Sequence, residues 1–276
     1  MDVTYSQLIE HLKGIGPTAV AFSGGVDSSL LVAMARDAYG DQALALTVAA
    51  PQMAGWEVEE ARQLARSLGV AHRVVELPLL PAIRDNPPER CYLCKRALFR
   101  ELLSVAALAG LTGLLDGTNR DDRGEHRPGL RALRELGVLS PLADCGLTKA
   151  DVRALARRLG LPNWDKPPYA CLLTRLPHGI PVREEMLRRI ESAERHLMDL
   201  GFQGARVRTH GDLARIELDP AQHPRLLREA ATIATRLQEV GYRQVTLDLL
   251  GYRTGSMDAE PTASKRPTPG AEHERI

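Results

Sequence analysis

A serine- and glycine-rich stretch near the start of the chain has the composition of an anion-binding loop. It reads Ser23-Gly24-Gly25-Val26-Asp27-Ser28 and lies between an apolar run over residues 18–22 and an apolar pattern with helical spacing. A strand, a glycine turn and a helix start direct free N–H groups and the positive end of the helix dipole at an anion. Asp27 would repel phosphate unless Mg²⁺ lies between them, so the stretch predicts a site for phosphate and Mg²⁺. A plain glycine turn is the alternative, although the whole string is far rarer than Gly-Gly.

Two cysteines at Cys-x-x-Cys spacing, Cys91 and Cys94, stand at the start of a predicted helix. A redox pair, half of a zinc site and two ligands of an iron–sulfur cluster all use this spacing, and two buried free thiols are the alternative. We expect a functional role, with thiol pKa values lowered by the helix N-terminus and nearby cations. Cys171 lies in a segment that we expect to be a polar, accessible loop, where its thiolate could react. Cys145 has no such context, and we expect it to be incidental. A fourth ligand of a cluster is the alternative.

Two further segments follow predicted strands, at the edge where open parallel sheets bind ligands. Backbone groups from Thr47 to Ala49 could contact an adenine edge, and a simple strand end is an equal alternative. The segment Gly117-Thr118-Asn119-Arg120-Asp121-Asp122 carries side chains that bind Mg²⁺ and phosphate, and a plain polar turn is the alternative. We expect this segment to lie opposite Asp27.

A concentration of positive charge lies in the last third of the chain. Arg206 and Arg208 are two residues apart, so their side chains share one face of a predicted strand, with His210 and Arg215 nearby. This patch suits a phosphate or a carboxylate. An exposed strand face, neutralised by acidic neighbours such as Glu217, is the alternative.

Strands that alternate with helices predict an α/β fold with a parallel sheet flanked by helices. The predicted strands cover residues 18–22, 42–49, 71–77, 111–115 and 138–142. The predicted helices cover residues 4–14, 57–68 and 95–109, and another begins with the capping box Thr148-Lys149-Ala150-Asp151.

The pattern changes after residue 182 and predicts a smaller α+β unit. It consists of an amphipathic helix over 183–200, a hairpin over 205–210 and 213–218, a helix over 224–240 and a strand over 243–250. We therefore divide the chain into an α/β domain (1–165), a cysteine-bearing hinge loop (166–182), a small α+β domain (183–252) and a disordered tail (253–276).

The composition is that of an ordinary globular protein, with 44% hydrophobic and 26% charged residues. A formal net charge of +1 gives no argument for a nucleic-acid or membrane partner. The start of the chain lacks the pattern of a secretory signal, and no apolar run is long enough to cross a bilayer, so we expect a cytoplasmic protein. Four cysteines in a chain of 276 residues do not form a disulfide scaffold.

In combination, these motifs resemble the LarE family, the ATP-dependent sulfur transferases of nickel-pincer cofactor synthesis within the PP-loop ATP pyrophosphatase superfamily. The resemblance covers about residues 4–252. It rests on residues 23–28, on Arg90-Cys91-Tyr92-Leu93-Cys94-Lys95, on residues 117–122, on Ala-Cys-Leu-x-x-Arg from residue 170 and on Val-Arg-x-His-Gly-x-x-Ala-Arg-Ile-Glu over residues 207–217.

The resemblance implies that each carboxylate of pyridinium-3,5-biscarboxylic acid mononucleotide is activated as an adenylate and converted to a thiocarboxylate. It implies that Arg206 and Arg208 hold the substrate phosphate and that Cys171 is the sulfur-bearing cysteine. We expect Mg²⁺ at Asp27 and Asp122, with Asp27 also serving catalysis. The expected ATP-binding residues are Ser23, Gly24, Gly25, Asp27, Ser28, Thr47, Gly117 and Asn119.

The family delivers sulfur in two ways. Members with a single cysteine give up that cysteine's sulfur and keep dehydroalanine, whereas members with three cysteines hold a [4Fe-4S] cluster. Because this chain has Cys91, Cys94 and Cys171, the resemblance favours a cluster, with Cys171 a ligand first and a sulfur donor only if the cluster is lost. It also implies a homo-oligomer that hands its product to other cofactor-synthesis proteins.

Three other functions remain open from the sequence. A tRNA thiolase of the same superfamily would also combine this loop with cysteines, although the net charge of +1 argues against RNA binding. An amidotransferase-type synthetase has no need of Cys-x-x-Cys. A nucleotide-binding sensor with a structural metal would bind ATP without releasing pyrophosphate.

Overall fold

The structure is a computed structural model of the chain, and it describes residues 3–124, 128–253 and 255–257. Its larger sheet is parallel, with the strand order β3-β2-β1-β4. The buried apolar side chains of the two central strands place them in the core. The strands are β1 (Ala19–Ala21), β2 (Leu44–Ala49), β3 (Ala71–Glu76) and β4 (Leu114–Leu115).

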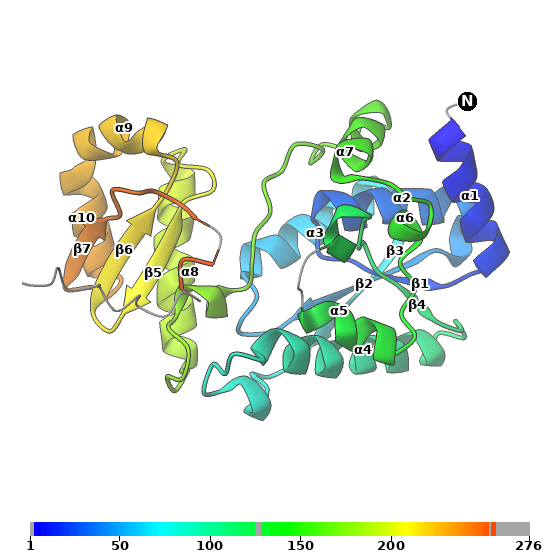
Figure 1. The fold of residues 1–276 in the computed structure, drawn as a ribbon, viewed down its shortest axis with the longest axis horizontal. Coiled ribbons are helices and arrows are strands. Elements are labelled where there is room, and N and C mark those ends of the chain that lie inside the picture. Colours follow the sequence, from blue (N-terminus) through cyan, green and yellow to red (C-terminus); the bar gives the residue numbers. More distant parts are fainter. Residues whose placement is uncertain (1–2, 125–127, 254, 258–276) are drawn as a thin grey trace, which may run out of the picture.

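Helices cover both faces of this sheet (Figure 1). One face packs against α1 (Val3–Ile15), α2 (Val26–Tyr39), α3 (Gly55–Ser67) and α7 (Lys149–Arg158). The other face packs against α4 (Arg90–Leu108) and α5 (Pro128–Glu135). This is the predicted α/β architecture, and the fold class is therefore confirmed.

The predicted fifth strand over residues 138–142 is wrong. The backbone there forms a single parallel bridge between Leu115 and Leu139, and α6 (Pro141–Asp144) begins directly afterwards. Proline has no N–H to donate to a strand ladder, and its fixed φ suits the first turn of a helix. Pro141 therefore ends the pairing.

The second sheet has the order β5-β6-β7. The predicted hairpin is confirmed, because β5 (Arg206–His210) and β6 (Leu213–Glu217) are antiparallel, while β7 (Gln244–Leu247) runs parallel to β6. Its core includes side chains of α8 (Glu184–Asp199), α9 (His223–Arg228) and α10 (Ala230–Glu239). The single helix predicted over 224–240 is thus two helices, because the backbone at Glu229 leaves the helical range (φ −99°, ψ 6°).

Short 3-10 helices complete the described structure. They are η1 (Gly40–Gln42), η2 (Pro81–Ile83), η3 (Asp121–Gly124), η4 (Leu172–Arg175) and η5 (Pro220–Gln222). No helix in the described ranges is both long and apolar enough to cross a membrane.

The segment that carries Cys171 is not the polar, accessible loop that we expected. Leu172, Leu173 and Leu176 are buried and pack in one apolar cluster with side chains from η2 and α8. The apolar spacing of these leucines follows the turns of η4, which places them in a core of their own. The domain boundaries at residues 165, 182 and 252 stay predictions. Most of the predicted tail, residues 258–276, lies outside the described residues.

Candidate active site

The loop over residues 23–28, called here the phosphate loop, joins β1 to α2. Gly24 has a φ of +73°, and a Cβ there would lie 3.4 Å from the Cβ of Ala61 on α3. Gly25 is the N-cap of α2 and provides no side-chain cap. The first N–H groups of α2 therefore have no capping side chain to compete with an anion.

Hydroxyl groups hold the phosphate loop in shape. Ser28 Oγ donates to the carbonyl of Gly25 (3.1 Å) and lies 3.2 Å from Ser23 Oγ. Asn163, which follows α7, adds two bonds from its Nδ2, to the carbonyl of Gly24 (2.9 Å) and to Ser29 Oγ (2.8 Å). Sequence reasoning missed Asn163, because nothing in a loop sequence shows which distant backbone it contacts.

Asp27, on the first turn of α2, is the centre of a polar cluster. Its Oδ1 accepts a hydrogen bond from Asn119 Nδ2 (3.1 Å), and its Oδ2 forms an ion pair with Lys149 Nζ. The structure therefore brings the segment after β4 to Asp27. Lys149 belongs to the predicted capping box, which is present, but no pattern in the sequence indicates that its side chain reaches the phosphate loop.

The other predicted ATP-binding residues have mainly structural contacts. A Cβ on Gly117 would lie 2.8 Å from the backbone nitrogen of Ser28, so only glycine lets this segment approach α2 so closely. Thr47 is buried, and its Oγ1 donates to the carbonyl of Phe22 (2.6 Å) and lies 2.8 Å from His72 Nε2. The Thr47 hydroxyl is therefore engaged within the sheet.

The two predicted Mg²⁺ ligands differ in their contacts. Asp27 presents hard carboxylate oxygens beside the phosphate loop, which is the ligand type that Mg²⁺ prefers. Asp122 Oδ2 accepts the backbone N–H of Asn119 (3.0 Å), and Asn119 Oδ1 accepts the backbone N–H of Asp121 (2.9 Å). The residue types thus fit Mg²⁺, and Asp122 also shapes the turn that presents Asn119.

Cys91, Cys94 and Cys171, called here the cysteine centre, lie near one another. Cys91 and Cys94 are on the first turn of α4, and Cys171 is the N-cap of η4. Burial raises the pKa of the Cys94 thiol to about 12, and the charges of Cys171 and Cys91 raise it further. Burial also raises the pKa of Cys171, with a further contribution from Cys91. For Cys94 the expected lowering of the thiol pKa is therefore wrong, because burial outweighs the helix N-terminus and the neighbouring cations.

The three thiols of the cysteine centre, each close enough to at least one other to raise its pKa, are the donor type of an iron–sulfur site. Within the described ranges, no three side chains of His, Cys, Asp or Glu converge closely enough to hold a single metal ion. An iron–sulfur cluster is larger than one ion, and its cysteines bind different irons, so its ligands do not converge on one point. The residue types of the cysteine centre therefore fit a cluster.

Distant backbone contacts hold the segments of the cysteine centre together. Asn86, with a φ of 45°, is buried, and its Nδ2 donates to the carbonyls of Leu176 (3.1 Å) and Pro177 (2.8 Å). Gln52 accepts the N–H of Leu172 at its carbonyl (2.9 Å) and donates its Nε2 to Cys94 Sγ (3.6 Å). The sequence offered one weak signal for Asn86, its place before two prolines, and none for Gln52.

A buried ion pair anchors the Cys171 segment to α8. Arg175 binds Glu194 through two bonds, Nε to Oε1 (2.9 Å) and Nη2 to Oε2 (3.0 Å), and both side chains are 0% exposed. Arg175 Nη1 also donates to the carbonyl of Cys171 (3.2 Å). Glu194 further accepts the N–H of Val207 (2.8 Å) and the hydroxyl of Tyr169. This network fixes Cys171 relative to β5.

Arg206 and Arg208, the predicted substrate-phosphate pair, are both 4% exposed. Arg206 Nη2 donates to the carbonyl of Pro168 (2.7 Å). Arg208 pairs with the buried carboxylate of Glu217 (2.8 Å) and donates to the carbonyl of Thr174 (2.9 Å). Both guanidinium groups thus hold the segment that carries Cys171, rather than forming an exposed basic patch.

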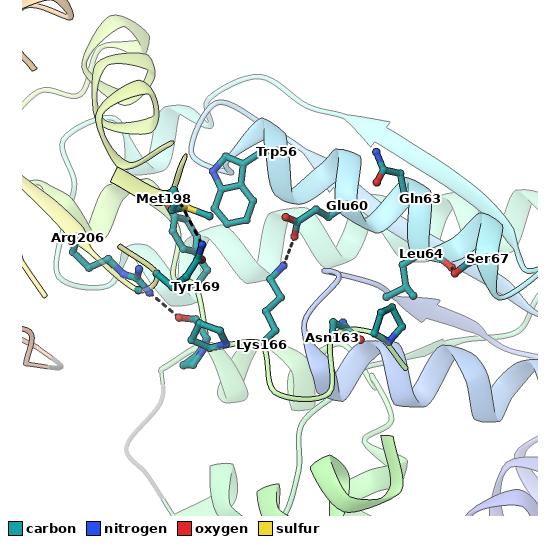
Figure 2. A pocket seen from close by; sticks show the side chains of 15 residues that line it. Trp56, Glu60, Gln63, Leu64, Ser67, Asn163, Lys166, Tyr169, Met198 and Arg206 are labelled. Carbon is teal, nitrogen blue, oxygen red and sulfur yellow. Dashed lines mark hydrogen bonds and ion pairs between the residues drawn. The ribbon is translucent and has the colours of Figure 1, made fainter. Parts of the chain in front are cut away.

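A cavity of about 490 Å³ lies between α3 and the segment around residue 166 (Figure 2). Lys166 crosses it to Glu60 (2.7 Å) and lies 3.8 Å from Glu57. Burial raises the pKa of Glu57 to about 7, although Lys166 opposes the shift. Trp56 and Tyr169 stack edge to face beside it, with ring centroids 4.7 Å apart.

Comparisons with known proteins give two kinds of match. The asparagine synthase family model matches residues 3–80, the part that includes the phosphate loop. The pyridinium-3,5-bisthiocarboxylic acid mononucleotide synthase of Lactiplantibacillus plantarum is 37% identical over 95% of this chain and 96% of its own length. An uncharacterized protein of Synechocystis sp. is 39% identical over 87% of this chain and 91% of its own. A tRNA-specific 2-thiouridylase of Rhodospirillum rubrum is 32% identical, over only 55% of this chain and 51% of its own.

Proposed function

Because the chain belongs to the LarE family, that of the pyridinium-3,5-bisthiocarboxylic acid mononucleotide synthases, we propose that it is an ATP-dependent sulfur transferase of nickel-pincer cofactor synthesis. Its substrate would be pyridinium-3,5-biscarboxylic acid mononucleotide, whose carboxylates become thiocarboxylates. The observation that carries the proposal is similarity over nearly the whole chain, since the relative from Lactiplantibacillus plantarum is 37% identical over 95% of it.

The phosphate loop would carry out the first half of the reaction. A substrate carboxylate oxygen attacks the α-phosphorus of ATP, which releases pyrophosphate and leaves an acyl adenylate. The N–H groups at the start of α2 would bind phosphate oxygens, and Asp27 with Asp122 would hold Mg²⁺. Lys149, which is paired with Asp27 in the structure, would exchange that contact for a phosphate oxygen. These groups stabilise the charge that develops on the leaving pyrophosphate.

The cysteine centre would supply the second half. We propose that Cys91, Cys94 and Cys171 would hold a [4Fe-4S] cluster, which would bind an added sulfide, and that this sulfide would displace AMP from the acyl carbon. Without a cluster, the Cys171 thiol would lose its proton and attack the acyl carbon, which releases AMP and forms a thioester. Loss of the Cα proton would then break the Cβ–Sγ bond, release the thiocarboxylate and leave dehydroalanine at position 171.

Arg206 and Arg208 would bind the substrate phosphate only after a change in their contacts. Arg208 already neutralises Glu217, and Arg206 is bonded to the carbonyl of Pro168. Binding a phosphate there would loosen the segment that carries Cys171, because the same guanidinium groups hold it. Substrate binding and the position of Cys171 would then be coupled.

One experiment tests both halves. The protein is purified without oxygen, reconstituted with iron and sulfide, and mixed with ATP and the biscarboxylic acid mononucleotide. We expect pyrophosphate, AMP and a thiocarboxylate by mass spectrometry, together with the broad visible absorbance of a cluster. A colourless protein, or one that loses hydrogen sulfide from Cys171 on turnover, would contradict the cluster mode and leave the sacrificial one. Absence of pyrophosphate would contradict the activity itself.

A second function, thiolation of tRNA, is favoured by the match to a tRNA-specific 2-thiouridylase. That match covers about half of each chain, however, so it supports a common ATP-using domain rather than a common substrate. Binding of tRNA at moderate salt would favour this second function, and we expect none.

A further inference from the structure

Gln52 connects the edge of the larger sheet where β2 ends to the two segments that carry Cys94 and Cys171. It lies in the loop after β2 and is 0% exposed. Its carbonyl accepts the N–H of Leu172, the residue directly after Cys171 (2.9 Å). Its side-chain Nε2 lies 3.6 Å from Cys94 Sγ, which is a hydrogen-bond distance for sulfur. One buried residue therefore contacts the segments of two cysteines that are far apart in the sequence.

Of the two polar groups of the Gln52 carboxamide, only the nitrogen has a hydrogen-bond partner among the described residues. Its Oε1 is buried and has no hydrogen-bond partner among the described residues. A buried carbonyl oxygen without a partner costs free energy, and such groups in native structures call for an explanation. Here the N–H groups point at sulfur, an acceptor that becomes strong when it is a thiolate or a metal ligand. This orientation is the useful one if Cys94 carries negative charge in the working protein.

We infer that Gln52 is a positioning residue of the cysteine centre. Its backbone and side chain fix the spacing between Cys94 and Cys171, and its N–H donates to the sulfur of Cys94. Because the loop follows β2, at the same sheet edge as the phosphate loop, Gln52 also fixes the sulfur relative to the site of adenylation. The inference rests on the proposed function, since it assigns a role within the sulfur-delivery site.

The spacing is tested in metal-free protein with a short bifunctional thiol reagent that bridges neighbouring cysteines. The proteins are the wild type, Gln52→Leu, Gln52→Glu and the control Gln63→Leu, which changes an exposed glutamine on α3. We expect the wild type and the control to form a Cys94–Cys171 bridge, identified by mass spectrometry, at equal rates and Gln52→Leu to form it several-fold more slowly. Equal rates in Gln52→Leu and the wild type, or no bridge in the wild type, would overturn the inference.

The hydrogen bond is tested after reconstitution with iron and sulfide. Hydrogen bonds to ligand sulfur stabilise the reduced, electron-rich cluster. Gln52→Leu and Gln52→Glu should therefore give a more negative reduction potential, with cluster retention lower by about tenfold. A change in retention at constant potential would indicate packing alone and would overturn the hydrogen-bond role. If the wild type binds no iron, the cluster mode of the proposed function fails, and the metal-free rates alone decide the role of Gln52.

Discussion

The phosphate loop takes its shape from residues 23–28 themselves, whereas the cysteine centre depends on contacts among residues that are far apart in the sequence. Ser23 and Ser28 bond to each other and to the backbone of Gly25 within the loop. Cys94 and Cys171, in contrast, are placed by residues such as Gln52, Asn86 and Glu194, which come from other elements.

The difference extends to charge and solvent. Asp27 at the phosphate loop is partly exposed, and so is Lys149, with which it forms an ion pair. The ion pair that anchors Cys171 is 0% exposed on both sides. We therefore expect substitutions at the phosphate loop to change reaction rate at nearly constant stability, and substitutions around the cysteine centre to change stability first.

Glu194→Ala should have the largest effect. The substitution leaves Arg175 as a buried charge without its partner and removes the acceptor of the Val207 N–H. We expect a loss of about 3–5 kcal/mol in the free energy of unfolding, measured by urea denaturation. Glu185→Ala, at an exposed position on the same helix, is the matched control. If Glu194→Ala lowered the free energy of unfolding by less than about 1 kcal/mol, the expected difference in stability between the cysteine centre and the phosphate loop would be contradicted.

Asp27→Asn tests the opposite expectation at the phosphate loop. It removes the negative charge that would bind Mg²⁺ while it keeps the size of the side chain. Pyrophosphate release should slow by about 100- to 1000-fold, measured under saturating ATP. The free energy of unfolding should change by less than about 1 kcal/mol, because the Lys149 pair is partly exposed. Asp37→Asn on the same helix serves as the control, and a large loss of stability at position 27 would count against the comparison.

Glu57→Gln probes the buried charges beside the cysteine-bearing segment, where Arg175 and Arg206 also act on Glu57. Burial raises the pKa of Glu57 from 4.5 to about 7. The stability that this group contributes is therefore present below pH 4.5 and is lost as the pH rises through 7. At pH 8 the glutamine variant should be more stable by about 1–3 kcal/mol, with little difference at pH 5. The melting temperatures of the variant and the wild type are compared at pH 5 and pH 8. An equal difference at both pH values would contradict the role of Glu57 ionisation.

Asn163→Ala should have the smallest effect. It tests whether the phosphate loop depends on a residue that is distant in the sequence. Asn163 is one of the distant residues that contact the phosphate loop, and it bonds to Gly24 and to Ser29, the residue directly after the loop. Because the loop is also held by its own serines, we expect a loss of only about 1 kcal/mol in stability and a modest rise in the KM for ATP. Stability is measured by urea denaturation, and the KM for ATP is measured from steady-state pyrophosphate release. A loss as large as that of Glu194→Ala would show that the phosphate loop also depends on remote contacts.

The sequence alone was sufficient for features that depend on neighbouring residues. It predicted the phosphate loop, the α/β class, the hairpin of β5 and β6, and the capping box at Thr148, because short-range hydrogen bonds and apolar spacing fix each of them. The role expected for Cys91, Cys94 and Cys171, from their spacing and from the resemblance to one family, stays a prediction.

Only the tertiary structure decided which side chains meet. Lys149 reaches Asp27 across 122 positions, Asn86 reaches Leu176 across 90, and Gln52 reaches Cys94 across 42. The burial that raises the pKa of Cys94, and that places Arg206 and Arg208 against the segment carrying Cys171, results from the same packing. Local sequence sets the conformation of a loop, but the desolvation and the partners of a side chain come from whatever the rest of the chain packs against it.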